Sequence, residues 1–138
     1  MRRILVVSTA GVDEPWLVGP TQQLAEETGA EVTVLAVDDV ESQRFEALPR
    51  DETVRQARET AERLADLLAE TGVAATPVAR SGPAAPTAID YGDEIDADLI
   101  VVGSSRRRRG VVQRLMGSLP LDLVQRSGRQ VLVVTEPD

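Results

Sequence analysis

Four short, almost entirely apolar runs recur along the chain and are rich in β-branched residues. They lie at Ile4–Val7, Val32–Val37, Leu99–Val102 and Val131–Val134. These runs lack the alternation of polar and apolar residues that a half-exposed strand shows, so they are typical of strands buried on both faces. Such strands occur almost only in parallel sheets covered by helices on both faces, and the pattern therefore predicts an α/β fold.

Segments with helical periodicity separate these runs, and the clearest of them is Asp51–Thr71. A further strand is predicted at Val73–Arg80, where Pro77 lacks the N–H group that an interior strand needs and so belongs at a sheet edge. The elements then alternate as βαβαβαβαβ, which predicts a doubly wound, five-stranded parallel sheet. Strand orders 2-1-3-4-5 and 3-2-1-4-5 both fit this alternation, and the edge position of Pro77 favours 3-2-1-4-5.

The composition excludes several classes of function. A length of 138 residues fits a single domain over residues 1–138. With 15 basic and 23 acidic residues the chain is an acidic protein with a formal net charge of -8, which disfavours nucleic acid as a partner. The absence of Cys and His excludes disulfides, thiolate nucleophiles, histidine-based triads and the common zinc sites. We therefore expect a binding protein, with no catalytic residue and no metal ligand.

No apolar run in the sequence is long enough for a signal peptide or a membrane span. The N-terminal Met1-Arg2-Arg3 is followed by only four apolar residues, Ile4–Val7. We therefore expect a cytoplasmic protein with no membrane partner.

The predicted strand order places a crevice at the carboxyl ends of the first and fourth strands, where the winding of the sheet reverses. The loops Ser8–Val12 and Gly103–Gly110 flank it. The second loop combines glycines, which let the backbone approach a phosphate, with the arginines at 106–109, which supply positive charge. Ser118 follows at the predicted start of a helix, where unpaired backbone N–H groups attract anions. The pattern predicts an anion-binding crevice, although a solvated basic loop followed by a helix cap would produce the same residues.

A series of short motifs lies in and between the last two predicted strands. Val101-Val102-Gly103-Ser104 is followed by Gly110, then by Arg-Leu-Met-Gly-Ser at 114–118, and finally by Val131–Val134. With these motifs the chain resembles the universal stress protein (UspA-like) family over its whole length. The resemblance implies a Rossmann-like, adenine nucleotide α-hydrolase-like fold and a role in stress-response regulation. It also implies ATP or ADP as the ligand of the crevice. Separately, the Asp38-Asp39 pair after the second predicted strand is a candidate ligand for Mg²⁺, although acidic pairs in loops are usually only solvated.

In ATP-binding members of this family, Gly-x-x-Gly after the fourth strand is followed by nine residues and then by Gly-Ser or Gly-Thr. Carried over to this chain, the resemblance implies a nucleotide site made of Thr9, Val37, Val102, Gly103, Arg107, Gly110, Gly117 and Ser118. The chain departs from the family pattern twice: Arg107 stands where the second glycine belongs, and Thr9 stands where the family has an adenine-contacting Asp. The alternative hypothesis is therefore a nucleotide-free, dimeric interaction module. A slow ATP hydrolase with aspartates as acid–base groups is a third hypothesis.

The last predicted strand lies at a sheet edge without any protecting residue. Its residues Val131, Leu132, Val133 and Val134 include no proline and no charge, and unprotected edges invite pairing with another chain. The resemblance implies a homodimer through this strand and a protein partner that the sequence does not identify. Coverage of the edge by the C-terminal tail Thr135–Asp138 is the alternative.

Overall fold

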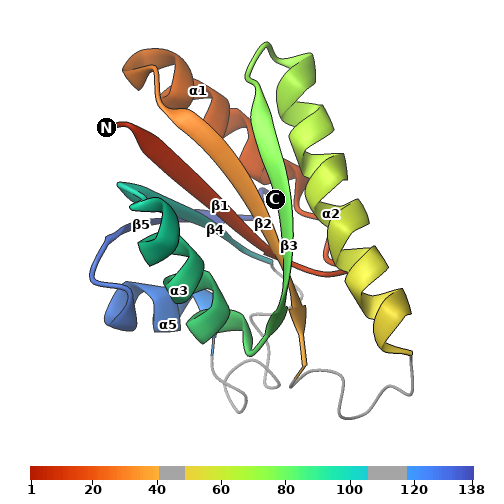
Figure 1. Cartoon of the computed structure of the whole chain (residues 1–138). Coiled ribbons are helices and arrows are strands. Elements are labelled where there is room, and N and C mark those ends of the chain that lie inside the picture. Colours follow the sequence, from red (N-terminus) through yellow and green to blue (C-terminus); the bar gives the residue numbers. More distant parts are fainter. Residues whose placement is uncertain (41–48, 106–117) are drawn as a thin grey trace.

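The computed structural model describes residues 1–40, 49–105 and 118–138. In these residues five strands form one parallel sheet in the order β3-β2-β1-β4-β5 (Figure 1). The strands are β1 (Arg3–Thr9), β2 (Glu31–Asp39), β3 (Ala75–Gly82), β4 (Leu99–Ser104) and β5 (Gln130–Thr135). The predicted order 3-2-1-4-5 is confirmed, and Pro77 lies in the edge strand β3, opposite Val34 of β2.

Helices cover both faces of the sheet (Figure 1). The helices α1 (Val18–Thr28) and α2 (Arg50–Glu70) cover one face, and α3 (Ala84–Ile95) and α5 (Leu119–Arg126) cover the other. Helix α1 follows a short 3-10 turn, η1 (Pro15–Leu17), and has Pro20 in its first turn, where a proline is tolerated. Among the described helices, none combines the length and the apolarity that crossing a bilayer requires.

The core has two layers because successive residues of each strand face opposite sides of the sheet. Ile4 and Val6 of β1 pack under α1 and α2, whereas Leu5 and Val7 pack under α3 and α5, and all four side chains are completely buried. Burial on both faces explains why the strands are continuously apolar in sequence.

Several element boundaries differ by one or two residues from those predicted. Strands β1 and β4 continue to Thr9 and Ser104, so Ser8 and Gly103 belong to strands and not to loops. Strand β3 begins at Ala75, two residues later than predicted. Polar residues end the apolar runs without ending the hydrogen-bonded ladder, because backbone pairing does not depend on the polarity of the side chain.

Candidate functional site

Three of the predicted nucleotide-site residues lie together on one face of the sheet, at its carboxyl end. Thr9 pairs in register with Val37. Val7, which precedes Thr9 by two residues and shares its face, pairs with Val102. Val37 and Val102 are buried and Thr9 is half-buried. The three side chains therefore lie on the face covered by α3 and α5, and Thr9 is the most exposed of them.

The backbone that follows β1 is held by β2 and α2. The N–H of Ala10 donates to the carbonyl of Val37 at 2.9 Å, and the N–H of Gly11 donates to Thr60 Oγ1 at 2.9 Å. Gly11 has a left-handed φ of 79°, and a Cβ at this position would lie 2.8 Å from Gln56 Nε2. The left-handed conformation favours glycine here, and the two hydrogen bonds give the backbone after β1 a defined shape.

The carboxylate of Glu14 lies against Gly103, on the face covered by α1 and α2. A Cβ on Gly103 would be only 2.8 Å from Glu14 Cδ and 3.2 Å from Trp16 Nε1. Glu14 is only 7% exposed, and the hydroxyl of Ser8 donates to its Oε1 at 3.2 Å. Sequence analysis missed Glu14, because one acidic residue in a loop of an acidic chain carries no signal. The glycine at 103 is explained by the close approach of this carboxylate.

Trp16 connects the same segment to the edge of the sheet. Its side chain is half-buried, and its Nε1 donates to the carbonyl of Val134 in β5 at 3.1 Å. The indole is therefore a packing residue at the entrance of α1, and it ties η1 to the last strand.

Ser118 is the N-cap of α5. Its backbone is extended, and its hydroxyl accepts a hydrogen bond from the N–H of Leu121 at 3.4 Å. The predicted position at a helix start is confirmed, whereas contact with a phosphate stays a prediction. Arg107, Gly110 and Gly117 lie outside the described residues.

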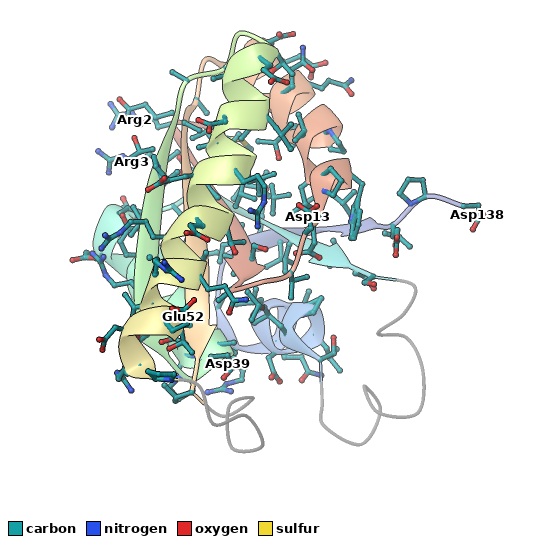
Figure 2. The ribbon with its side chains drawn as sticks, turned by 90° about the vertical axis from the view of Figure 1, so that its right-hand side faces the viewer. Arg2, Arg3, Asp13, Asp39, Glu52 and Asp138 are labelled. Carbon is teal, nitrogen blue, oxygen red and sulfur yellow. The ribbon has the colours of Figure 1, made fainter. Side chains whose placement is uncertain are left out.

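Asp38 is a buried carboxylate that links three elements. It is 1% exposed and accepts hydrogen bonds from Thr53 Oγ1 of α2 at 3.1 Å and from Ser81 Oγ of β3 at 2.9 Å. Asp39, the next residue, lies at the carboxyl end of the sheet near Glu52, far from Arg2 and Arg3 at the opposite end (Figure 2). In the part of the chain that the structure describes, no three acidic residues are arranged to hold a metal ion. The hydroxyl contacts assign Asp38 a structural role.

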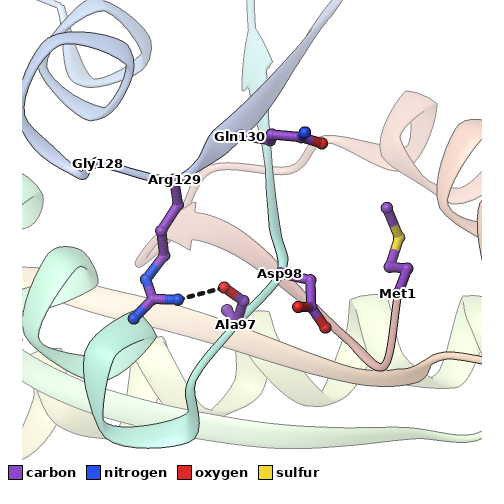
Figure 3. Close-up of a pocket in the computed structure, with 6 residues that line it drawn as sticks. All are labelled: Met1, Ala97, Asp98, Gly128, Arg129 and Gln130. Carbon is purple, nitrogen blue, oxygen red and sulfur yellow. Dashed lines mark hydrogen bonds between the residues drawn. The ribbon is translucent and has the colours of Figure 1, made fainter.

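An open pocket of about 480 Å³ lies at the other end of the sheet, where β4 and β5 begin (Figure 3). Its charged groups are already engaged in hydrogen bonds: Asp98 Oδ2 accepts from the backbone N–H groups of Arg2 at 2.7 Å and Arg3 at 2.9 Å. Arg129 donates to Asp93 and to the carbonyl of Ala97. These contacts hold the start of β1 and β5 to the turn before β4, so we interpret the pocket as structural.

Asp98 leads to a prediction about the pH dependence of stability. Hydrogen bonds from the backbone N–H groups of Arg2 and Arg3 lower the pKa of the Asp98 carboxyl below its ordinary value. A carboxyl whose pKa is lowered by folding stabilises the folded state above its unfolded pKa of about 3.9, and this contribution is lost as the pH falls through the folded pKa. We expect Asp98→Asn to be less stable than the wild type in urea unfolding at pH 6, with a difference that shrinks in acid.

Glu94→Gln serves as the control for Asp98→Asn, because Glu94 is an exposed carboxylate on the neighbouring helix α3. We expect its urea midpoint to follow the wild type from pH 6 into acid. Equal midpoints for all three proteins at pH 6 would contradict the role given to Asp98.

The topology of the sheet defines a class of protein. A parallel 3-2-1-4-5 sheet with its switch point between β1 and β4 is a doubly wound α/β fold, a class whose ligands generally bind at the carboxyl ends of the strands beside that point. The model of the universal stress protein family matches residues 1–135, and the chain belongs to this family. No curated protein sequence is significantly similar to it.

Solved structures of universal stress proteins share the fold. The protein from Archaeoglobus fulgidus in complex with dAMP has a TM-score of 0.71 and 20% identity, with 97% of this chain and 98% of that chain covered. A universal stress protein in complex with cAMP has a TM-score of 0.66 and 24% identity, and the match covers 99% of this chain and 98% of that chain. UspA from Lactobacillus plantarum has a TM-score of 0.69 and 18% identity, and the match covers 97% of this chain and 99% of that chain.

Proposed function

We propose that this chain is a non-catalytic, cytoplasmic stress-response domain that binds an adenine nucleotide at the carboxyl ends of β1, β2 and β4. The observation that carries the proposal is the shared face of Thr9, Val37 and Val102. The buried valines on the two neighbouring strands make the surroundings of this point apolar, and the half-buried hydroxyl of Thr9 between them offers a hydrogen bond to a base. The dAMP and cAMP complexes of similar structures support an adenine nucleotide as the ligand class.

The phosphates of the nucleotide belong at the start of α5 in this proposal. Ser118 caps that helix, and the first backbone N–H groups of a helix attract anions. The sequence supplies Arg106–Arg109 between β4 and this cap, so positive charge is available within the same connection.

Denaturing the purified protein and separating the supernatant by anion exchange shows whether it carries ATP, ADP or AMP. We also expect added nucleotide to raise the thermal midpoint. A ligand at about 100 times its dissociation constant adds about 2.7 kcal/mol to the free energy of unfolding. No released nucleotide together with an unchanged midpoint would overturn the proposal, and steady release of phosphate from ATP would contradict the non-catalytic part.

A second candidate is a dimeric module that works without nucleotide. The observation that favours it is the position of Glu14, whose carboxylate fills the space beside Gly103. The same denaturation experiment separates the two candidates.

We also propose that the chain forms a homodimer through β5. Val133 on β5 is 38% exposed. Helix α5 packs on the face of the sheet to which Val133 points, and its residues Leu121 and Val124 are more than half exposed. The C-terminal tail continues along β4, because the N–H of Glu136 donates to the carbonyl of Ser104 at 2.8 Å. Asp138 lies away from the sheet (Figure 2), which supports a tail that does not run along the outer edge of β5.

A further inference from the structure

The sheet has two edges, β5 on one side and β3 on the other (Figure 1). We infer that Pro77 and Arg80 close the outer edge of β3 against the addition of another strand, so that copies of this chain join through β5 alone and assembly stops at two. The closure of β3 stands on its own contacts, whereas the limit of two copies rests on the homodimer proposed above.

The direction of the backbone groups identifies the residues of β3 that face outward. The N–H of Val40 donates to the carbonyl of Gly82 at 3.3 Å, so the backbone groups of Gly82 point towards β2. Successive residues of a strand direct these groups alternately to its two sides. The outward positions of β3 are therefore Ala75, Pro77, Ala79 and Ser81.

Pro77 occupies the middle of this outer edge. It is exposed, and it pairs in register with Val34 of β2. Because its backbone points outward, the missing N–H takes no hydrogen bond away from the ladder to β2. A strand that approached from outside would instead find no donor at this position, and the proline ring would stand in its path.

Arg80 covers the outward carbonyl next to Pro77. Its guanidinium lies over the ring of Tyr91 in α3, with Cζ 5.1 Å from the ring centroid, and its Nη1 donates to the carbonyl of Ala79 at 3.1 Å. The attraction between a cation and an aromatic face favours this position of the side chain. An incoming strand would have to displace a charged donor before it could use the carbonyl of Ala79.

Closure of one edge decides which assembly can form. Two copies that pair β5 with β5 use the same edge of each, which makes a closed dimer. Pairing of β5 with β3 of the next copy would join different edges, and this contact could repeat without end to form a filament. Strand β5 contains neither proline nor a charged residue, so it remains the edge that accepts a partner.

The double variant Pro77→Thr/Arg80→Thr should open the edge of β3. Threonine restores the outward N–H and suits a strand without adding a large apolar side chain, and loss of the guanidinium frees the carbonyl of Ala79. In analytical ultracentrifugation we expect the wild type to stop at the dimer and the double variant to form larger species whose share rises with concentration. In a Val133→Pro background, which removes an outward N–H from β5, the two substitutions should lower the dissociation constant of self-association at least about tenfold.

Ala79→Pro, added to the double variant, is the matched control. It places a proline at the neighbouring outward position, so the species larger than a dimer should disappear. If loss of the contact between Arg80 and Tyr91 unfolds the double variant, Pro77→Thr alone provides the same test, because it changes no bond to β2.

The outcomes distinguish the closure of β3 from the proposed homodimer. A dimeric wild type whose double variant keeps the same size in both backgrounds would overturn the inference. Species larger than a dimer in the wild type, or in the double variant after Ala79→Pro, would overturn it as well. A monomeric wild type whose double variant associates would overturn the homodimer and support the closure of β3. If both proteins were monomeric, neither proposal would stand.

Discussion

Val133→Pro is expected to convert a homodimer into a monomer that keeps its fold. Successive residues of a strand direct their backbone groups alternately to the two sides, and Glu136 donates inward to Ser104. Val134 and Leu132 therefore point towards β4, and Val133 points towards the open edge. Proline at 133 removes an outward N–H and adds a ring there, which blocks pairing with a second chain, whereas the ladder to β4 loses nothing. We expect a dimer dissociation constant at least 100-fold higher, measured by sedimentation equilibrium.

Two further variants define what this result means. Val133→Thr keeps the outward N–H and nearly the same volume, so it should remain dimeric. Leu132→Pro removes an inward N–H and leaves its acceptor on β4 unpaired, so it should lower the free energy of unfolding by about 1 to 3 kcal/mol, measured with urea. A Val133→Pro protein that sediments as a dimer, or a wild type that is monomeric at high concentration, would show that β5 is not the dimer edge.

The sheet was predictable because its chemistry repeats along the chain. Buried parallel strands must be apolar on both faces, so runs such as Ile4–Val7 and Leu99–Val102 stand out without any knowledge of their partners. One residue decided the strand order, since Pro77 lacks a donor and cannot lie in the middle of a sheet. Strand ends were less predictable. Ser8 and Gly103 belong to β1 and β4, but neither residue type is typical of a buried strand.

The candidate site was only partly predictable, and the reason is geometric. Thr9 and Val37 could be placed together because Thr9 follows the first apolar run and Val37 ends the second, and the ends of neighbouring parallel strands meet at one edge. Glu14 could not be placed, because its position depends on how the 3-10 turn η1 folds back over β4. A glycine such as Gly103 has two explanations in sequence, a ligand or a neighbouring side chain, and only the structure reveals the neighbour.

Gly103→Ala should lower the free energy of unfolding by about 1 to 3 kcal/mol, the usual cost of an added group in a packed interior. Its φ is not in the left-handed region, so the cost comes from crowding and not from the backbone. The new methyl group would lie 2.8 Å from Glu14 Cδ, closer than real Cβ contacts, and would force the carboxylate away from Ser8. Urea unfolding measures the effect. Gly19→Ala is the control: nothing lies within 4 Å of a Cβ there, and alanine in a helix should be neutral or slightly stabilising.

A double-mutant cycle assigns that cost to the contact itself. In a Glu14→Ala background the carboxylate is absent and only Trp16 Nε1, at 3.2 Å, remains close to the new methyl group. Gly103→Ala should therefore cost at least about 1 kcal/mol less there than in the wild type, which is a coupling energy of the size that residues in direct contact show. Equal costs in the two backgrounds would mean that Glu14 does not lie against β4. A coupled pair would instead show that the segment before α1 packs directly against the end of β4, so that the glycine at 103 is explained by a neighbouring side chain.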